Sequence, residues 1–195
     1  MVSMGLRFGC LLFIFQCLLV GAETPAVKKA DKAVSRGDWV TPAIETKRVT
    51  HHVFESKALK EKVSYHLYRP AAYEEGSKAR FPVLYWLHGS GGGQDGIAPL
   101  AKFFDDAIQA GKVQPFLVVF VNGLPQGMYV DWKDGSTPIE SMIMKDLLPH
   151  IDATNRTIAS REGRMLDGFS MGGYGAARLG FKYPEVFRTV SILGA

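Results

Sequence analysis

The sequence predicts an α/β fold with a mostly parallel sheet and helices on both faces. Two observations support this prediction. From residue 81 onwards, short apolar runs of strand length alternate with amphipathic stretches of helical length. Two of the runs end in glycine-rich turns, at 88–93 and 168–173. With 47% hydrophobic and 11% aromatic residues, the chain has enough apolar surface for the core of one domain.

The first 22 residues are predicted to be a signal peptide. Arg7 provides a short positive region, and the apolar stretch 10–20 leads to the small residues 20–22, which fit a cleavage site. A membrane span is the alternative, but it needs about 20 apolar residues and this stretch is shorter. Both cysteines lie in this segment, so a mature chain starting near Glu23 has neither a disulfide nor a thiol nucleophile. We expect a secreted or periplasmic protein with no stable membrane span after cleavage.

A polar, lysine-rich leader is expected over 23–45, followed by the folded domain over 46–195. Two strands are expected to open the domain, at 49–54 and 63–69, joined by a polar stretch. The run at 81–87 is apolar throughout, which is typical of a buried strand.

Further along the chain we expect helices at 99–110 and 142–151 and strands at 116–121 and 189–193. The apolar side of the first helix is expected to hold Leu100, Phe103, Phe104 and Ala107. Asp146, in the second helix, is expected to be buried or paired. The polar loop around Trp132, with Asp131 and Asp134, fits a surface turn better than a wall of a substrate cleft, although loops serve both roles.

The strongest motif is Gly168-Phe169-Ser170-Met171-Gly172, which reads Gly-x-Ser-x-Gly. This pattern is typical of a nucleophilic serine on a sharp turn between a strand and a helix. Glycines on both sides of the serine remove Cβ atoms where the strained backbone is crowded. A short strand at 163–167 and a helix with small residues at 174–183 give the motif the context it needs. Ser170 is therefore the predicted nucleophile.

A second motif, His88-Gly89-Ser90-Gly91-Gly92-Gly93, follows the strand at 81–87. It is similar to the glycine loop that supplies one amide of an oxyanion hole. We expect the backbone N–H groups of Ser90 and Met171 to bind the oxyanion, with His88 and Gly89 supporting the loop. A flexible glycine turn or a phosphate loop is the alternative, but the Gly-Lys-Ser/Thr ending of a phosphate loop is missing.

These two motifs, together with the segments Asp146–Ile151 and Tyr183–Phe187, resemble the esterase D-like branch of the alpha/beta hydrolases. That branch includes feruloyl and acetyl-xylan esterases, S-formylglutathione hydrolases, enterochelin esterases and mycolyltransferases. The resemblance implies antiparallel leading strands and an acyl-enzyme mechanism through Ser170. It implies a small-molecule or polysaccharide-linked ester as substrate, and we expect neither a metal nor a cofactor.

The resemblance also implies that the acid and the histidine of the triad follow the serine. The residues after Ser170 include no histidine and no aspartate. The histidines before it are poor candidates for the base: His51, His52, His66, His88 and His150. His150 is expected at a helix end, where a cation suits the helix dipole. We therefore expect a C-terminally truncated fold with little activity and an apolar strand left at the edge of its sheet.

Two other functional classes stay open from the sequence. One is a fragment of a serine peptidase of the prolyl-oligopeptidase type, and the other is a secreted binding protein that kept the fold and lost the triad. Acyl transfer to a sugar instead of water, and the choice among phenolic, acetyl and thioester substrates, also stay open. The net charge of +4 comes from dispersed residues without a basic stripe, so we do not expect nucleic acid as a partner.

Overall fold

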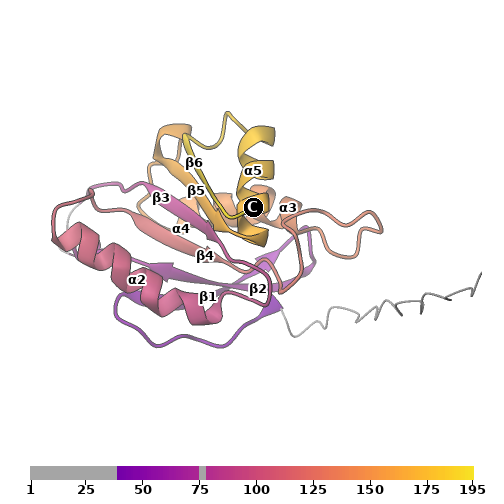
Figure 1. Ribbon diagram of the computed structural model, residues 1–195, viewed down its shortest axis with the longest axis horizontal. Coiled ribbons are helices and arrows are strands. Elements are labelled where there is room, and N and C mark those ends of the chain that lie inside the picture. Colours follow the sequence, from indigo (N-terminus) through magenta and orange to yellow (C-terminus); the bar gives the residue numbers. More distant parts are fainter. Residues whose placement is uncertain (1–38, 75–77) are drawn as a thin grey trace, which may run out of the picture. The chain divides into compact units, whose positions relative to one another are not determined.

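The computed structural model describes residues 39–74 and 78–195, so the predicted signal peptide and most of the predicted leader lie outside the described residues. The described residues form a six-stranded sheet with the order β1-β2-β4-β3-β5-β6 (Figure 1). Its strands are β1 (Val49–Ser56), β2 (Glu61–Tyr68), β3 (Val83–Leu87), β4 (Leu117–Val121), β5 (Arg164–Phe169) and β6 (Thr189–Leu193).

The sheet is mixed in the way that the sequence and the resemblance predict. β2 is antiparallel to both β1 and β4, whereas the β3–β4, β3–β5 and β5–β6 pairs are parallel. Every residue of β3 and β4 is buried, because both faces of the parallel part are covered. Because β3, β4 and β5 are parallel, their carboxyl ends lie together at one edge of the sheet. The strand order changes direction around β3, which is where open α/β sheets bind ligands.

Helices cover both faces of this sheet (Figure 1). α2 packs on one face through Ile97 and Ala101, against Trp86 and Phe120 of the strands. The other face carries α5 and the helical segment from α3 to α4, and this side holds the larger core. The helical elements are α1 (Ala71–Glu74), α2 (Gln94–Gln109), α3 (Ile139–Ser141), the π-helix η2 (Met142–Leu147), α4 (Leu148–Thr154), the 3₁₀-helix η3 (Arg161–Gly163) and α5 (Met171–Lys182).

The prediction for the first long helix was wrong at its start and on its buried side. α2 begins at Gln94, and Pro99 lies inside it. The added turn brings Ile97 one turn before Ala101, so the buried stripe runs through these two residues. Phe103 is therefore 64% exposed, although the sequence placed it on the apolar side.

The helix expected at 142–151 is the middle of a longer helical segment that starts with α3 and ends with α4. Asp146 is paired, as expected: it accepts hydrogen bonds from the Ser56 hydroxyl at 2.7 Å and the Ala58 amide at 2.9 Å. His150 lies within α4, where its ring stacks on Phe54. Burial lowers the pKa of His150, which disfavours the cation expected at a helix end.

Residues 39–44, at the end of the predicted leader, lie against the sheet. Trp39 belongs to the core, and its carbonyl accepts a hydrogen bond from the Asn122 side chain at 3.0 Å. The Thr41 amide donates to the Ser64 hydroxyl of β2 at 2.9 Å. These contacts hold the segment against β2 and against Asn122, the residue that follows β4.

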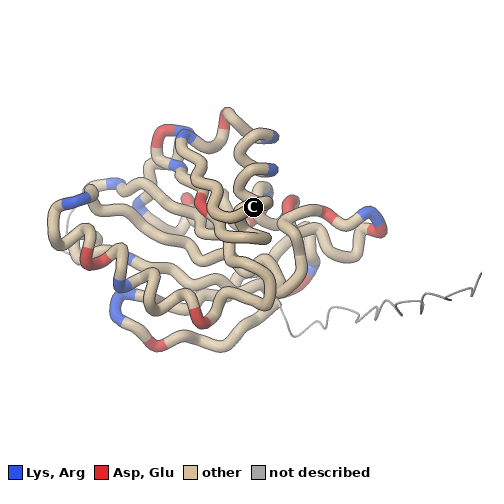
Figure 2. The backbone as a smooth tube through the Cα atoms, in the orientation of Figure 1, with Lys and Arg blue, Asp and Glu red and all other residues tan. Residues whose placement is uncertain are grey.

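Charged residues of both signs are interspersed over the described backbone (Figure 2). Within residues 39–74 and 78–195, no helix has both the length and the apolar character needed to cross a membrane.

Candidate active site

Ser170 lies in the one-residue turn between β5 and α5, at the edge where the carboxyl ends of the strands meet. Its backbone has φ 54° and ψ −117°, a conformation that costs a non-glycine residue energy. The turn is held in place because the Ser170 amide donates to the Leu193 carbonyl of β6 at 2.8 Å. The helix begins directly at Met171, three residues earlier than predicted. The Ser170 side chain is half-buried at this edge.

The two glycines of the motif are required by close backbone contacts. A Cβ atom at Gly168 would lie 2.1 Å from the Gly172 carbonyl oxygen. A Cβ atom at Gly172 would lie 1.9 Å from the Leu87 carbonyl oxygen of β3. These distances are far below van der Waals contact, so the sharp turn and its close approach to β3 exclude any side chain.

The glycine loop after β3 lies directly beside the nucleophile. A Cβ atom at Gly89 would be 3.5 Å from the Ser170 Cβ atom, so the two segments are in contact. Met171 is the first residue of α5, so its N–H group has no acceptor within the helix. Ser90 follows Gly89 and is exposed. The assignment of the Met171 and Ser90 amides to an oxyanion hole stays a prediction, and this proximity agrees with it.

His88 holds the glycine loop in place. Its Nδ1 atom is 2.7 Å from the Gly89 carbonyl oxygen, and its Nε2 atom accepts a hydrogen bond from the Gly123 amide at 3.3 Å. Burial lowers the pKa of His88, so the ring is neutral at pH 7. Because both ring nitrogens have backbone partners, His88 is in no position to take a proton from Ser170. This agrees with the supporting role that the sequence predicted.

Tyr129 is a residue of the site that sequence reasoning missed. Its fully buried ring fits between Gly123 and Gly175, where Cβ atoms would come within 2.3 Å and 2.5 Å of it. Its hydroxyl donates to the His88 carbonyl oxygen at 2.9 Å. Tyr129 and Met128 both have φ 54°, so the backbone is strained where it places this ring. The glycines at 123 and 127 were the available signal, since they permit close packing in an otherwise ordinary loop.

The other four histidines lie on β1 and β2, at the end of the sheet away from β5, or pack against these strands. His51 and His66 are cross-strand partners with ring centroids 4.9 Å apart, and His52 stacks on Tyr65. His150 bonds the Tyr65 hydroxyl at 3.1 Å. These positions agree with the prediction that none of the four is the base for Ser170. In the described part of the chain, no group of three or more His, Cys, Asp or Glu residues is arranged to hold a metal ion.

The polar loop after β4 uses its carboxylates for local turns. Asp131 accepts hydrogen bonds from the Ser141 amide at 2.9 Å and from its hydroxyl at 2.7 Å. Asp134 accepts from the Ser136 amide and hydroxyl. Both carboxylates therefore accept hydrogen bonds from nearby residues of the chain, which favours a surface turn over a wall of a substrate cleft.

Comparison with known proteins agrees with this geometry. Residues 56–195 match the model of the family Esterase, described as "Putative esterase". The chain belongs to this esterase family. The matched region runs from the end of β1 to the last residue and includes Ser170 and the glycine loop.

Curated relatives of this esterase chain include two bacterial proteins. An endo-1,4-beta-xylanase/feruloyl esterase of Xylanibacter ruminicola is 30% identical over 179 residues, which are 86% of this chain and 23% of that protein. Esterase Rv1288 of Mycobacterium tuberculosis is 31% identical over 157 residues, which are 74% of this chain and 31% of that protein. The chain thus spans about a quarter to a third of the length of these relatives.

Solved structures show the same fold. A ferulic acid esterase superposes with a TM-score of 0.65 at 26% identity, over 71% of this chain and 55% of that one. A ferulic acid esterase from Anaeromyces mucronatus, in complex with ferulic acid, superposes with a TM-score of 0.61 at 18% identity, over 80% of this chain and 63% of that one. The fold is therefore that of alpha/beta hydrolase esterases.

Proposed function

We propose that this chain forms the nucleophile-bearing part of an exported serine carboxylic-ester hydrolase. The observation that carries the proposal is the placement of Ser170. The strained turn holds its side chain at the edge of the sheet, against Gly89 of the glycine loop and at the amino end of α5. The proposed oxyanion amides belong to the two elements beside this hydroxyl, the glycine loop and the amino end of α5, and acyl transfer requires such donors next to the nucleophile.

The proposed reaction has two steps. In the first, the Ser170 Oγ atom attacks the ester carbonyl carbon, the bond to the alcohol oxygen breaks, and the serine proton passes through a base to the departing alcohol. In the second, water attacks the acyl-enzyme and releases the acid, while Ser170 regains its proton. The Met171 and Ser90 amides stabilise the oxyanion in both steps, and the positive end of α5 adds to this.

Both steps need a base for Ser170. His88 is occupied by backbone partners, and the other four histidines lie on β1 and β2 or pack against these strands. We propose that full activity requires an acid and a histidine outside the 195 residues. When members of a triad are removed, binding and the oxyanion hole still leave about 10³–10⁴-fold acceleration over water. The chain alone is therefore expected to be acylated slowly and to be deacylated slowly.

For the substrate, we propose an ester of an aromatic acid, with the alcohol part belonging to a polysaccharide. Two names support this choice: the relative from Xylanibacter ruminicola is called a xylanase/feruloyl esterase, and the Anaeromyces mucronatus structure holds ferulic acid. Export agrees with such a substrate, because plant polysaccharides lie outside the cell. Acetyl esters and acyl transfer to a sugar are the alternatives that a substrate panel would separate.

The proposal can be tested by acylation of the chain itself. We would incubate it with p-nitrophenyl acetate, follow the intact mass, and map the acetyl group by peptide mass spectrometry. One acetyl group on Ser170 is expected to accumulate, because deacylation also needs the missing base. Ser170→Ala should lose that group while surface lysines react as before. Imidazole, as an external base, should speed acylation of Ser170 and leave the variant unchanged.

Two outcomes would contradict the proposal. If the Ser170 peptide is acetylated no faster than a surface serine, with or without imidazole, Ser170 is not an activated nucleophile. If the chain turns over repeatedly without imidazole and Ser170→Ala abolishes this, the idea of an external base is wrong. Ethyl ferulate and a feruloylated xylan fragment then replace p-nitrophenyl acetate to test the substrate class.

A further inference from the structure

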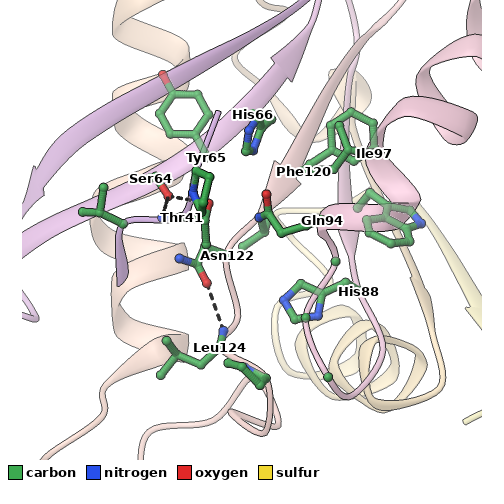
Figure 3. A pocket seen from close by; sticks show the side chains of 18 residues that line it. Thr41, Ser64, Tyr65, His66, His88, Gln94, Ile97, Phe120, Asn122 and Leu124 are labelled. Carbon is green, nitrogen blue, oxygen red and sulfur yellow. Dashed lines mark hydrogen bonds between the residues drawn. The ribbon is translucent and has the colours of Figure 1, made fainter. Parts of the chain in front are cut away.

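A cavity of about 210 Å³ borders the glycine loop after β3 (Figure 3). Its walls come from residues 40–42, from β2, from the ends of β3 and β4, and from the start of α2. Neither Ser170 nor Met171 is among the described residues that line it. The cavity is therefore distinct from the candidate active site, although His88 and the glycines 91–93 border it.

The cavity has an apolar wall that suits a ring. Trp86, Ile97 and Phe120 form this wall, and each of them is at most 9% exposed. A cavity of about 150 Å³ lined by apolar side chains is large enough to bind benzene. At about 210 Å³, this one holds a single six-membered ring together with a small substituent.

One polar atom in the cavity wall lacks a partner. The Oε1 atom of Gln94 is buried and accepts no hydrogen bond from the described residues. Figure 3 shows the Gln94 side chain reaching into the space between His66 and His88. A buried acceptor without a partner costs free energy, so a bound molecule with a donor would be favoured here.

The neighbouring polar groups already have partners within the protein. The His66 Nε2 atom accepts a hydrogen bond from the Ile44 amide at 3.2 Å, and the Asn122 Oδ1 atom accepts one from the Leu124 amide at 3.1 Å. The Ser64 hydroxyl accepts one from the Thr41 amide. The Gln94 Oε1 atom is thus the group that can favour a ligand with a hydrogen-bond donor over one without.

The cavity is also electrically neutral. The described residues that line it include no Asp, Glu, Lys or Arg. Burial, together with the nearby His51, lowers the pKa of His66 to about 4, so this ring is uncharged at pH 7. A charged ligand would lose its hydration without gaining a counter-charge, which strongly disfavours ions.

We propose that this cavity is a binding site for an uncharged one-ring molecule that carries a hydroxyl group, of the size of phenol. The ring packs against Trp86, Ile97 and Phe120, and the hydroxyl donates to the Gln94 Oε1 atom. The proposal depends on the cavity alone and holds whether or not the chain has esterase activity.

The test is a binding titration by NMR on the full chain with three probes. Phenol has both the ring and the donor, anisole has the ring without the donor, and benzoate adds a charge. Phenol is expected to bind saturably and to shift the Trp86 indole resonance. Anisole should bind a few-fold to about tenfold more weakly, as expected for one lost hydrogen bond, and benzoate should not bind.

Two variants and a matched control locate the site. Gln94→Leu should bind phenol only as well as anisole, whereas Gln109→Leu, at the opposite end of α2, should keep the preference of the unchanged protein. Ile97→Trp should fill the cavity and abolish binding of both. Since a bulky residue at 97 can prevent folding, only variants with an unchanged circular dichroism spectrum count.

Three outcomes would overturn the proposal. The first is equal affinity of the unchanged protein for phenol and anisole. The second is a Gln94→Leu variant that binds phenol unchanged. The third is no saturable binding of phenol, which would mean that the cavity holds only water.

Discussion

The hydroxyl oxygen of Tyr129 lies 2.9 Å from the backbone carbonyl oxygen of His88 and donates a hydrogen bond to it. This contact joins the loop after β4 to the glycine loop after β3. A second contact between the same loops runs from the Gly91 amide to the Pro125 carbonyl at 2.9 Å. Both contacts restrain the glycine loop, which carries the predicted oxyanion amide of Ser90 and touches Ser170 through Gly89. The loop after β4 therefore helps to position that amide.

Tyr129→Phe removes this hydrogen bond and keeps the ring between Gly123 and Gly175. It leaves the buried carbonyl of His88 with one partner fewer, so the free energy of unfolding should fall by about 1–2 kcal/mol. Under conditions where the variant is fully folded, the lower stability alone does not change the rate of acylation. The acetylation rate of Ser170 should nevertheless fall, because the glycine loop has lost one of its contacts. Urea unfolding and the acetylation rate measure the two effects. Phe181→Leu, at an exposed position of α5, is the control that should change neither.

Gly172→Ala tests the close approach of the serine turn to β3. Its Cβ atom would lie 1.9 Å from the Leu87 carbonyl oxygen, and the three atoms nearest to it all belong to the backbone of Leu87 and His88, which cannot turn aside as a side chain can. We expect a loss of about 3 kcal/mol or more, or failure to fold, as for other severe steric conflicts. In Gly96→Ala, within α2, the new Cβ atom meets only side chains, with Trp86 nearest at 3.5 Å. That control should be stabilised by about 0.5–1 kcal/mol. Similar thermal stability of the two variants would show that the turn has room for a Cβ atom.

The strained backbone at Ser170 should lower the free energy of unfolding, compared with a protein that has glycine at this position. At φ 54° and ψ −117°, glycine avoids a steric cost that serine and alanine bear. Ser170→Gly is therefore expected to raise the free energy of unfolding by about 1 kcal/mol, while Ser170→Ala leaves it nearly unchanged. Chemical denaturation of the three proteins measures this order. A Ser170→Gly variant less stable than Ser170→Ala would show that the turn is unstrained.

Glu140 connects α3 to the end of α5 by hydrogen bonds, and its ionisation should make the free energy of unfolding depend on pH. Its buried carboxylate accepts hydrogen bonds from Arg178 at 3.0 Å and Tyr183 at 2.6 Å, and also from Lys182. Burial alone would raise the pKa of Glu140, but the hydrogen bonds from Lys182, Tyr183 and Arg178 outweigh it, and the pKa lies below the ordinary 4.5. A lowered carboxyl pKa adds stability above pH 4.5 that is lost as the pH falls through the folded-state value.

Glu140→Gln should therefore lower the free energy of unfolding at pH 7 by about 1–3 kcal/mol. The difference from the unchanged protein should shrink as the pH falls from about 5 towards 3. The measurement is urea unfolding across this pH range. Glu55→Gln, on the exposed side of β1, should show no such pH-dependent difference. A gap that stays constant with pH would exclude titration of Glu140 as the cause.

The outer strand β6 should promote self-association. One of its edges pairs with β5, and the other has no partner strand among the described residues. Its exposed apolar side chains are Val190, Ile192 and Leu193. Such an edge can pair with a second chain, so Ile192→Lys should shift the protein towards monomer in sedimentation velocity. Val53→Lys, on the opposite edge strand β1, is the matched control. Equal association of both variants would exclude β6 as the contact.

The sequence predicted the parts of the fold that depend on local pattern. All six strands were expected close to their observed positions. β3 and β4 are short, wholly apolar runs, and the sequence pattern of such a run indicates a buried strand directly. The Ser170 turn was found because its glycines are required sterically. The start of α2 was missed because Pro99 was read as a helix start, whereas it lies inside the helix. Tyr129 was missed because its role depends on Gly175, which is distant in sequence.

The central position of β3 has a consequence for how the chain acquires its structure. This strand pairs with β4 on one side and with β5 on the other, and the chain makes β5 only after β4, the loop that carries Tyr129 and the helices α3 to α4. Until β5 emerges from the ribosome, an apolar strand has one edge open. Nascent chains with such edges are prone to misassembly, which makes the pairing of β5 the step that protects the open edge of β3. The same step brings Ser170 to the glycine loop, so the central strand gains its second partner as the nucleophile reaches its place.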